Sequence, residues 1–137
     1  MHLIEGPVPY TAITEIIAKA GKNTENGAHS LFLGQVRSDH SEGKQVRAIE
    51  FSAFEEMVIG EADKINKTIL SEFGDVKSIE ILHSKGIVRA GEISLFVMVS
   101  AGHSEQAQKA CAKAVEMIRD KLPIWRKEIF EDDPSGG

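Results

Sequence analysis

The sequence predicts an α+β domain in which helices pack against a mainly antiparallel sheet. Apolar residues recur at helical spacing in three segments, 11–20, 55–73 and the stretch after His103. Strand-like segments separate the helices in pairs, 28–36 with 46–54 and 76–84 with 93–100. Because helices alternate with hairpin-like strand pairs, we expect a sandwich with the helices on one face of the sheet.

The composition indicates one globular domain and excludes some classes of partner. The 137 residues suit a single domain, and a hydrophobic content of 42% excludes a disordered chain. A net charge of -5 argues against nucleic acid or membrane as a general partner. The start of the chain has no signal-peptide pattern, and no apolar run is long enough for a membrane span. The single cysteine, Cys111, suits a reducing compartment, so we expect a cytoplasmic protein.

The first half of the chain predicts a helix, two strands and a second helix. Thr11 is the expected N-cap of the first helix, and Gly21 is expected to end it. Within the strand 28–36, Gly34 indicates a bulge or a close approach of another backbone. The polar segment 37–45 predicts a mobile loop. The apolar stripe of the second helix consists of Val58, Ala62, Ile65, Ile69 and Phe73.

The second half predicts a central strand and a closely packed helix. The segment 93–100 is apolar on both faces, which favours a position inside the sheet. The segment 85–92, with two glycines, is expected to connect it to the preceding strand. Pro123 should end the last helix. Residues 132–137 predict a flexible tail, so the domain is expected to span 1–131. The stripe of the last helix consists of Ala107, Ala110, Cys111, Ala114, Val115 and Ile118.

A basic cluster follows that last helix, on a chain that is acidic as a whole. The segment 118–130 carries the four cations Arg119, Lys121, Arg126 and Lys127 around a Leu-Pro-Ile-Trp turn. One interpretation is a solvated helix end whose cations complement the helix dipole. The other is a pocket for an anion.

Two further residues stand at the ends of predicted elements and favour the anion pocket. Arg37 closes the first strand, and His103 precedes a helix N-terminus whose amides would suit a phosphate. Arg37 and Arg119 could hold oxyanions bidentately. A surface charge and a helix cap are the alternative interpretations of Arg37 and His103. His29, His40 and His83 are interpreted as structural or solvated, and nothing has the spacing of metal ligands. The residues alone therefore indicate no reaction.

Four motifs, in order, resemble the catalytic (large) subunit of molybdopterin synthase. They are GAHSLFLGQVR at 27–37, IEFSAFEEM at 49–57, LHSKGIVRAGEISLFVMVSAGH at 82–103 and KLPIWRKEIF at 121–130. The resemblance covers most of the chain, from Gly27 to Glu131. It implies an α/β-hammerhead-like fold, in which an antiparallel mixed sheet packs with helices and a small additional sheet is present.

The resemblance also implies an activity and partners. The family converts cyclic pyranopterin monophosphate to molybdopterin, with sulfur from the C-terminal Gly-Gly thiocarboxylate of a small ubiquitin-like carrier subunit. A homodimer that binds one carrier at each end, with no resident cofactor or metal, is the implied assembly. Because sulfur arrives on the carrier, no cysteine nucleophile is required of Cys111.

By position, the resemblance assigns roles to the basic residues. Three positions depart from the family pattern: Ser104 replaces an arginine, and Arg119 and Arg126 each replace a lysine. Arginine keeps the charge, but it does not lose a proton near neutral pH and cannot act as a base. The implied substrate-binding residues are Arg37, His103, Ser104, Arg119, Arg126, Lys127 and Glu128, and the implied catalytic residues are Arg119, Lys121 and Lys127.

Two hypotheses accommodate these departures. Arg119 could act only electrostatically while Lys121 or Lys127 handles protons. Alternatively, the chain is a diverged, non-catalytic homologue that serves as an anion-binding or scaffold subunit. Outside the resemblance, a structural oligomer with Trp125 and Phe130 as interface anchors is a further hypothesis. The terminal Gly136-Gly137 also resembles the carrier's own ending, which we interpret as coincidence.

Overall fold

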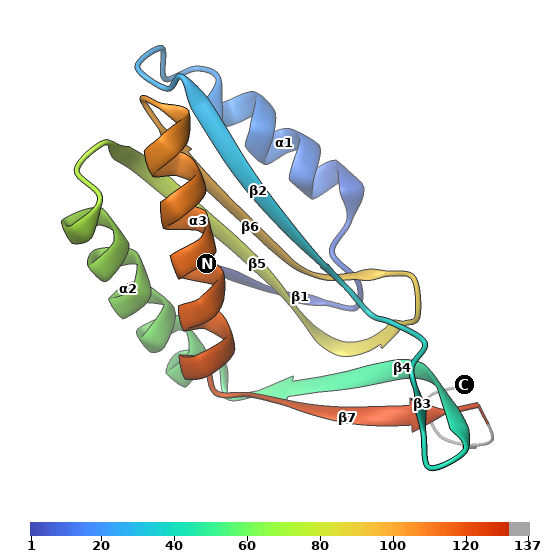
Figure 1. Cartoon of the computed structure of the whole chain (residues 1–137). Coiled ribbons are helices and arrows are strands. Elements are labelled where there is room, and N and C mark those ends of the chain that lie inside the picture. Colours follow the sequence, from blue (N-terminus) through green and yellow to red (C-terminus); the bar gives the residue numbers. More distant parts are fainter. Residues whose placement is uncertain (132–137) are drawn as a thin grey trace.

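The computed structural model describes residues 1–131, where a seven-stranded sheet packs against helices on both of its faces (Figure 1). This arrangement confirms the predicted α+β class. The strands are β1 (His2–Glu5), β2 (Ala28–Gln35), β3 (His40–Ser41), β4 (Lys44–Ala53), β5 (Val76–Arg89), β6 (Ile93–Ala101) and β7 (Ile124–Phe130). The helices are α1 (Tyr10–Ala20), α2 (Glu55–Glu72) and α3 (Ser104–Lys121).

Strand β6 lies at the centre of the larger part of the sheet. It pairs antiparallel with β2 on one side and β5 on the other, and all nine of its residues are buried. Successive side chains point to opposite faces. Val97 and Val99 pack in the core under α2 and α3, whereas Phe96 and Met98 pack under α1.

The predicted central strand is thus confirmed, but the expectation that all helices cover one face is wrong. Helix α1 lies on the face opposite α2 and α3 (Figure 1). The physical reason is that β6 is apolar on both sides, so each side needs a cover.

The helices follow their predicted stripes closely. The small residues predicted for α3 are all buried, and so are the predicted residues of α2 apart from Phe73 at its C-cap. One detail is wrong: Pro9, rather than Thr11, occupies the N-cap of α1, and no side chain caps that helix. Gly21 forms the C-cap of α1, and Pro123 follows the end of α3, as predicted.

Strand β5 belongs to two parts of the sheet. Its first half pairs with β6, and it also pairs with β1 in parallel through Lys85. Its last residues, from Gly86 to Arg89, pair instead with β4. The predicted connector 85–92 is therefore wrong at its start, because β5 continues to Arg89. Gly86 has φ +88°, a left-handed conformation that favours glycine, at the point where the strand changes partners.

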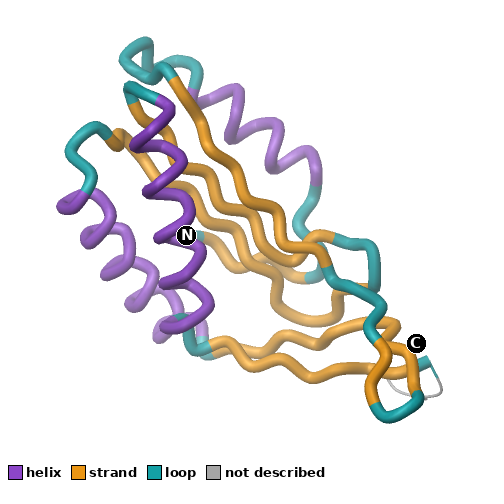
Figure 2. Tube along the Cα trace, viewed as in Figure 1, coloured by secondary structure: helices purple, strands orange, loops and turns teal. Residues whose placement is uncertain are grey.

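The end of β5 contributes to a small additional sheet, which confirms that element of the predicted fold. Strand β4 pairs with β5, β7 and the short β3, and this layer extends from the end of α3 (Figure 2). A separate apolar cluster supports it, formed by Val36, Val46, Ile49, Phe51 and Val88.

Three strands were absent from the sequence-based expectations. Strands β1 and β3 have four and two residues, too few to show alternation. Strand β7 lies along β4 and has four consecutive exposed residues, so its sequence shows no period of two. The predicted tail 132–137, with its Gly-Gly ending, lies outside the described residues. No helix among residues 1–131 has the length and apolar character of a membrane span.

We predict that Gly86→Ala destabilises the protein. A Cβ at position 86 would lie 2.5 Å from a carboxylate oxygen of Glu5, and its φ is +88°. Strain of this kind costs about 1–3 kcal/mol, which thermal unfolding would detect as a lower Tm.

Gly60→Ala is the matched control. Gly60 lies inside α2, and a Cβ added there would have no neighbouring atom within 4 Å, so alanine should raise stability by about 0.5–1 kcal/mol. A Gly86→Ala protein as stable as the wild type would contradict the role assigned to the β5 bend.

Candidate functional site

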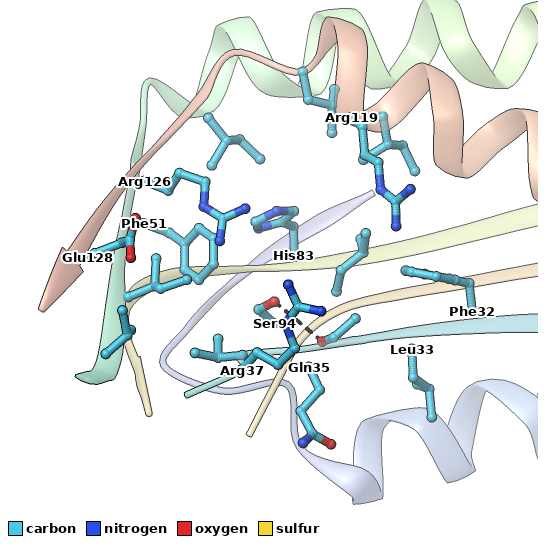
Figure 3. Close-up of a pocket in the computed structure, with 18 of the residues that line it drawn as sticks. Phe32, Leu33, Gln35, Arg37, Phe51, His83, Ser94, Arg119, Arg126 and Glu128 are labelled. Carbon is cyan, nitrogen blue, oxygen red and sulfur yellow. Dashed lines mark hydrogen bonds between the residues drawn. The ribbon is translucent and has the colours of Figure 1, made fainter. Parts of the chain in front are cut away.

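A cavity of about 720 Å³ lies where three parts of the fold meet. The end of β2 and the middle of β5 form one side, the last turn of α3 forms another, and β4 with β7 forms the third (Figure 3). The bend of β5 between the two parts of the sheet holds these walls apart. Within residues 1–131 we find no group of His, Cys, Asp and Glu side chains placed to hold a metal ion.

Three arginines line this cavity, each from a different element. Arg37 follows β2, Arg119 belongs to the last turn of α3, and Arg126 lies on β7 (Figure 3). Arg37 forms a two-contact ion pair with Asp39, at 3.0 Å from Nε and 3.3 Å from the second amino nitrogen. Both side chains of this pair are largely exposed, so it contributes about 1 kcal/mol or less. An anionic ligand can therefore compete with Asp39 for Arg37.

Arg119 is positioned by an aromatic ring. Its guanidinium carbon lies 5.4 Å from the centroid of the Phe32 ring. Phe32 faces α3 because alternate side chains of β2 point to that face of the sheet, and Gly34 leaves room beside Leu95 for the strands to approach closely. A planar guanidinium stacks well on such a ring, which is one physical advantage of arginine over lysine here.

Strand β7 sorts the predicted basic cluster onto two faces. Arg126 and Glu128 line the cavity, whereas Lys127, between them in sequence, is exposed on the other face. Trp125 is also exposed there and makes an edge contact with Phe54, with ring centroids 5.9 Å apart. Lys121, at the end of α3, is exposed and does not line the cavity. Because the sequence analysis did not predict β7, it could not predict which residues of this segment line the cavity.

His103 and Ser104 lie at the opposite end of α3 from the cavity. At about 1.5 Å per residue, the helix separates Ser104 from Arg119 by about 22 Å. The backbone N–H of His103 donates to Asp75 at 2.7 Å, and its Nδ1 lies 3.1 Å from the same oxygen. Of the predicted site residues, the structure thus brings Arg37, Arg119, Arg126 and Glu128 together in one cavity of the chain. His103, Ser104, Lys121 and Lys127 do not line that cavity.

His83 lines the cavity, although the sequence interpretation made it structural or solvated. It lies on β5, opposite Leu95 of β6, and only 9% of it is exposed. Its ring makes an edge contact with Phe51, with centroids 5.2 Å apart, and its Nδ1 lies 2.8 Å from the carbonyl oxygen of Ser84. The available signal was an imidazole directly after the apolar residues Ile81 and Leu82 of a strand.

The surroundings of His83 favour its neutral form. Burial lowers the pKa of His83 below its ordinary value of 6.5, and the charge of Arg126 lowers it further. The hydrogen bond to Ser84 raises the pKa of His83, but the pKa remains below its ordinary value. Because a carbonyl oxygen only accepts, Nδ1 carries the proton of the neutral ring and Nε2 keeps its lone pair.

Cys111 is unsuited to nucleophilic chemistry. It is buried in the core between α3 and the sheet, and burial raises the pKa of its thiol. A hydrogen bond with Ser30 lowers that pKa by less than burial raises it. A buried thiol with a raised pKa is a poor nucleophile.

The geometry defines a class of protein: an α+β domain whose arginine-lined cavity, at the junction of two sheets, suits an oxyanion such as phosphate. The family model described as MoaE protein matches residues 6–121. The chain belongs to the MoaE protein family, and the two relatives described next are molybdopterin synthase catalytic subunits.

Individual relatives and solved structures agree with this membership. The chain is 39% identical over 115 residues to the molybdopterin synthase catalytic subunit of Dictyostelium discoideum, covering 83% of this chain and 72% of the relative. It is 35% identical over 136 residues to that of Drosophila willistoni, covering 98% of this chain but only 35% of the longer relative.

Two solved structures share the fold. Molybdopterin synthase from Staphylococcus aureus superposes with a TM-score of 0.83 at 27% identity, covering 96% of this chain and 91% of that chain. A Helicobacter pylori complex of subunits 1 and 2 of molybdopterin-converting factor gives a TM-score of 0.78 at 19% identity, covering 97% and 90%. Because its identity to this chain is only 19%, the Helicobacter pylori structure supports the shared fold alone.

We predict that His83 makes the protein less stable in mild acid. A histidine whose folded-state pKa is lowered contributes stability that is present above its unfolded pKa and lost as pH falls through the folded pKa. The free energy of unfolding in urea should therefore drop between pH 7.5 and pH 5.5, and drop less in His83→Gln. Equal pH dependence in the two proteins would contradict the assignment of a neutral, buried His83.

Proposed function

We propose that this chain is a sulfurtransferase subunit that converts cyclic pyranopterin monophosphate to molybdopterin. The sulfur would come from the C-terminal thiocarboxylate of a small ubiquitin-like carrier. The observation that supports this most directly is the cavity with three arginines on a chain of net charge -5. A phosphate and a thiocarboxylate are both anions, so a site that receives them together needs several cations. The names of the relatives support the reaction class.

Within this proposal, the arginines have separate roles. Arg37, whose exposed pair with Asp39 is weak, would bind the substrate phosphate. Arg119, held over Phe32, would stabilise the oxyanion that develops at the carrier's carbonyl as sulfur moves. Arg126 and Glu128 would orient the pterin between them. No resident cofactor is part of this proposal, and the buried Cys111 takes no part in it.

The proposed carrier would insert its Gly-Gly tail into the cavity. The Helicobacter pylori structure that shares this fold is a complex of subunits 1 and 2 of molybdopterin-converting factor, and we propose an assembly of two kinds of subunit for this chain as well. A tail of two glycines is narrow enough to enter between β2 and β7 beside larger cavity residues. A reducing, cytoplasmic location would suit a thiocarboxylate and a free thiol.

A homodimer would account for His103 and Ser104. Since α3 separates them from the cavity of their own chain by about 22 Å, they can contact substrate only at the cavity of a second copy. His103 is exposed and oriented by Asp75, so it is available at the surface. We therefore propose that the two-fold dimer supplies these residues across its interface. Lys127 and Lys121 would likewise act outside the cavity of their own chain, on the carrier's surface.

A second candidate function follows from the two arginines at family lysine positions. Neither Arg119 nor Arg126 can release a proton near neutral pH, which would suit a non-catalytic subunit that binds the carrier or an anion as a scaffold. A dithiolene assay with thiocarboxylated carrier and cyclic pyranopterin monophosphate separates the two functions. Binding without product would favour the scaffold.

We predict that Arg119→Ala reduces molybdopterin formation about 100-fold or more, because a preorganised cation at a developing oxyanion contributes roughly that factor. Carrier binding, measured by calorimetry, should change little. Arg89→Ala is the control, since Arg89 is an exposed arginine at the end of β5 that does not line the cavity. Unchanged turnover in Arg119→Ala would remove Arg119 from the mechanism.

We also predict that two inactive variants restore activity when mixed. If His103 serves the cavity of the other subunit, His103→Ala and Arg119→Ala chains that exchange at random form mixed dimers with one intact site. Recovery should reach about a quarter of wild-type activity, given equal chains in a two-fold dimer. Two inactive variants that remain inactive as a mixture, despite subunit exchange shown by mass spectrometry, would place both residues at one chain's site.

A further inference from the structure

We propose that His83 is a catalytic base of the cavity, with Nε2 as the atom that accepts the proton. This inference rests on the proposed function, because it concerns the same cavity and the same reaction. It adds a residue that neither the sequence motifs nor the family resemblance assigned to catalysis.

The ring is held in one orientation by two contacts. Nδ1 is engaged with the carbonyl oxygen of Ser84 at 2.8 Å, and the edge of Phe51 packs against the ring. Since Nδ1 donates, the lone pair belongs to Nε2, which has no hydrogen-bond partner among residues 1–131. An oriented imidazole with a free lone pair on the wall of a cavity is the arrangement that general-base catalysis requires.

The cavity has few other groups able to accept a proton. Its three arginines cannot, and Lys121 and Lys127 do not line it. Asp39 is engaged by Arg37 in two contacts, but an anion bound to Arg37 would release it. Asp39 and Glu128 are the carboxylates among the described lining residues and are therefore the competing candidates. The charge that acts on His83 is that of Arg126 from β7, and the other charged groups that line the same cavity are Glu128 from β7, Arg119 from α3, and Arg37 and Asp39 after β2.

The need for a base arises from the chemistry of sulfur transfer. When the thiocarboxylate sulfur bonds to a substrate carbon, a C–O bond of that carbon breaks and its electron pair leaves with the oxygen. The product is a thioester, which still links carrier and substrate. Release requires water to attack the thioester carbonyl, so that a C–O bond forms and the acyl C–S bond breaks. The electron pair of that bond stays on sulfur as a thiolate, and the carrier leaves as a carboxylate once the second water proton has passed to solvent.

His83 would act in the hydrolytic step. As the water oxygen bonds to the carbonyl carbon, Nε2 of His83 takes one water proton and the ring becomes cationic. The arginines stabilise the oxyanion formed at the carbonyl oxygen. The proton on Nε2 then passes to the departing thiolate or to solvent, and the neutral ring is restored. The nearby charge of Arg126 favours that return, because it disfavours the cationic ring.

The test is the pH profile of single-turnover dithiolene formation, with thiocarboxylated Gly-Gly carrier and cyclic pyranopterin monophosphate, between pH 5.5 and 8.5. The wild-type rate should fall on the acid side as Nε2 becomes protonated. His83→Gln should be slower by about 10²- to 10⁴-fold at pH 7.5 and should lose the acid limb. Glu128→Gln and Asp39→Asn should each keep that limb, whatever their overall rates.

The outcomes separate this inference from the function on which it rests. A wild-type protein that forms no dithiolene at any pH contradicts the proposed function. If the wild-type protein forms dithiolene, two results contradict the role of His83. One is an acid limb in His83→Gln equal to that of the wild type, and the other is an acid limb that is lost only in Glu128→Gln or Asp39→Asn.

A second measurement needs no variant and covers the case in which His83→Gln fails to fold. Nitrogen-15 NMR of histidine-labelled wild-type protein should show His83 as the Nδ1–H tautomer at pH 7.5. Inorganic phosphate, added as a probe of the cavity, should shift the Nε2 resonance. An Nε2–H tautomer, or a charged ring at that pH, overturns the proposal.

Discussion

The geometry of the site depends on one strand that pairs with two sets of partners. The first half of β5 is fixed by β6 and β1, and its last four residues are fixed by β4. Between them, Gly86 adopts a conformation that side chains disfavour. This bend directs the small sheet away from the large one, and α3 with β7 closes the space that results. The cavity is therefore a consequence of strand pairing, and its lining residues come from segments far apart in sequence.

The elements that could be predicted were those whose own residues encode the buried face. The small residues of α3 and the stripe on α2 predict their packing because helical periodicity is read within one segment. Strand β7 could not be predicted in the same way, because its identity comes from pairing with β4 rather than from alternation. The face covered by α1 was also missed, although the two-sided apolar character of 93–100 already required a cover on each side.

The candidate site could likewise be predicted only where a residue's role depends on its position in the sequence rather than on tertiary geometry. The family resemblance identified Arg37, Arg119 and Arg126, which converge, because such motifs mark positions rather than depend on tertiary geometry. It could not tell which neighbours of Arg126 share its face, since that depends on β7 being a strand. The interpretation of His83 as structural or solvated was incomplete for a related reason: one polar residue in a buried strand is compatible with a core hydrogen bond and with a cavity wall. Its burial and its hydrogen bond to the Ser84 carbonyl agree with a structural role, and the residue also lines the cavity.

The stacking of Arg119 on Phe32 has a consequence for charge. An arginine held by a carboxylate brings a compensating negative charge with it, as Arg37 does with Asp39. An aromatic ring orients the guanidinium while leaving its full positive charge. Among residues 1–131, Arg119 forms no ion pair, so the α3 wall of the cavity presents a positive field within an acidic protein. That field acts over roughly a Debye length, about 8 Å at physiological ionic strength. Approaching anions are therefore drawn more strongly toward the arginine on the helix than toward the compensated one after β2.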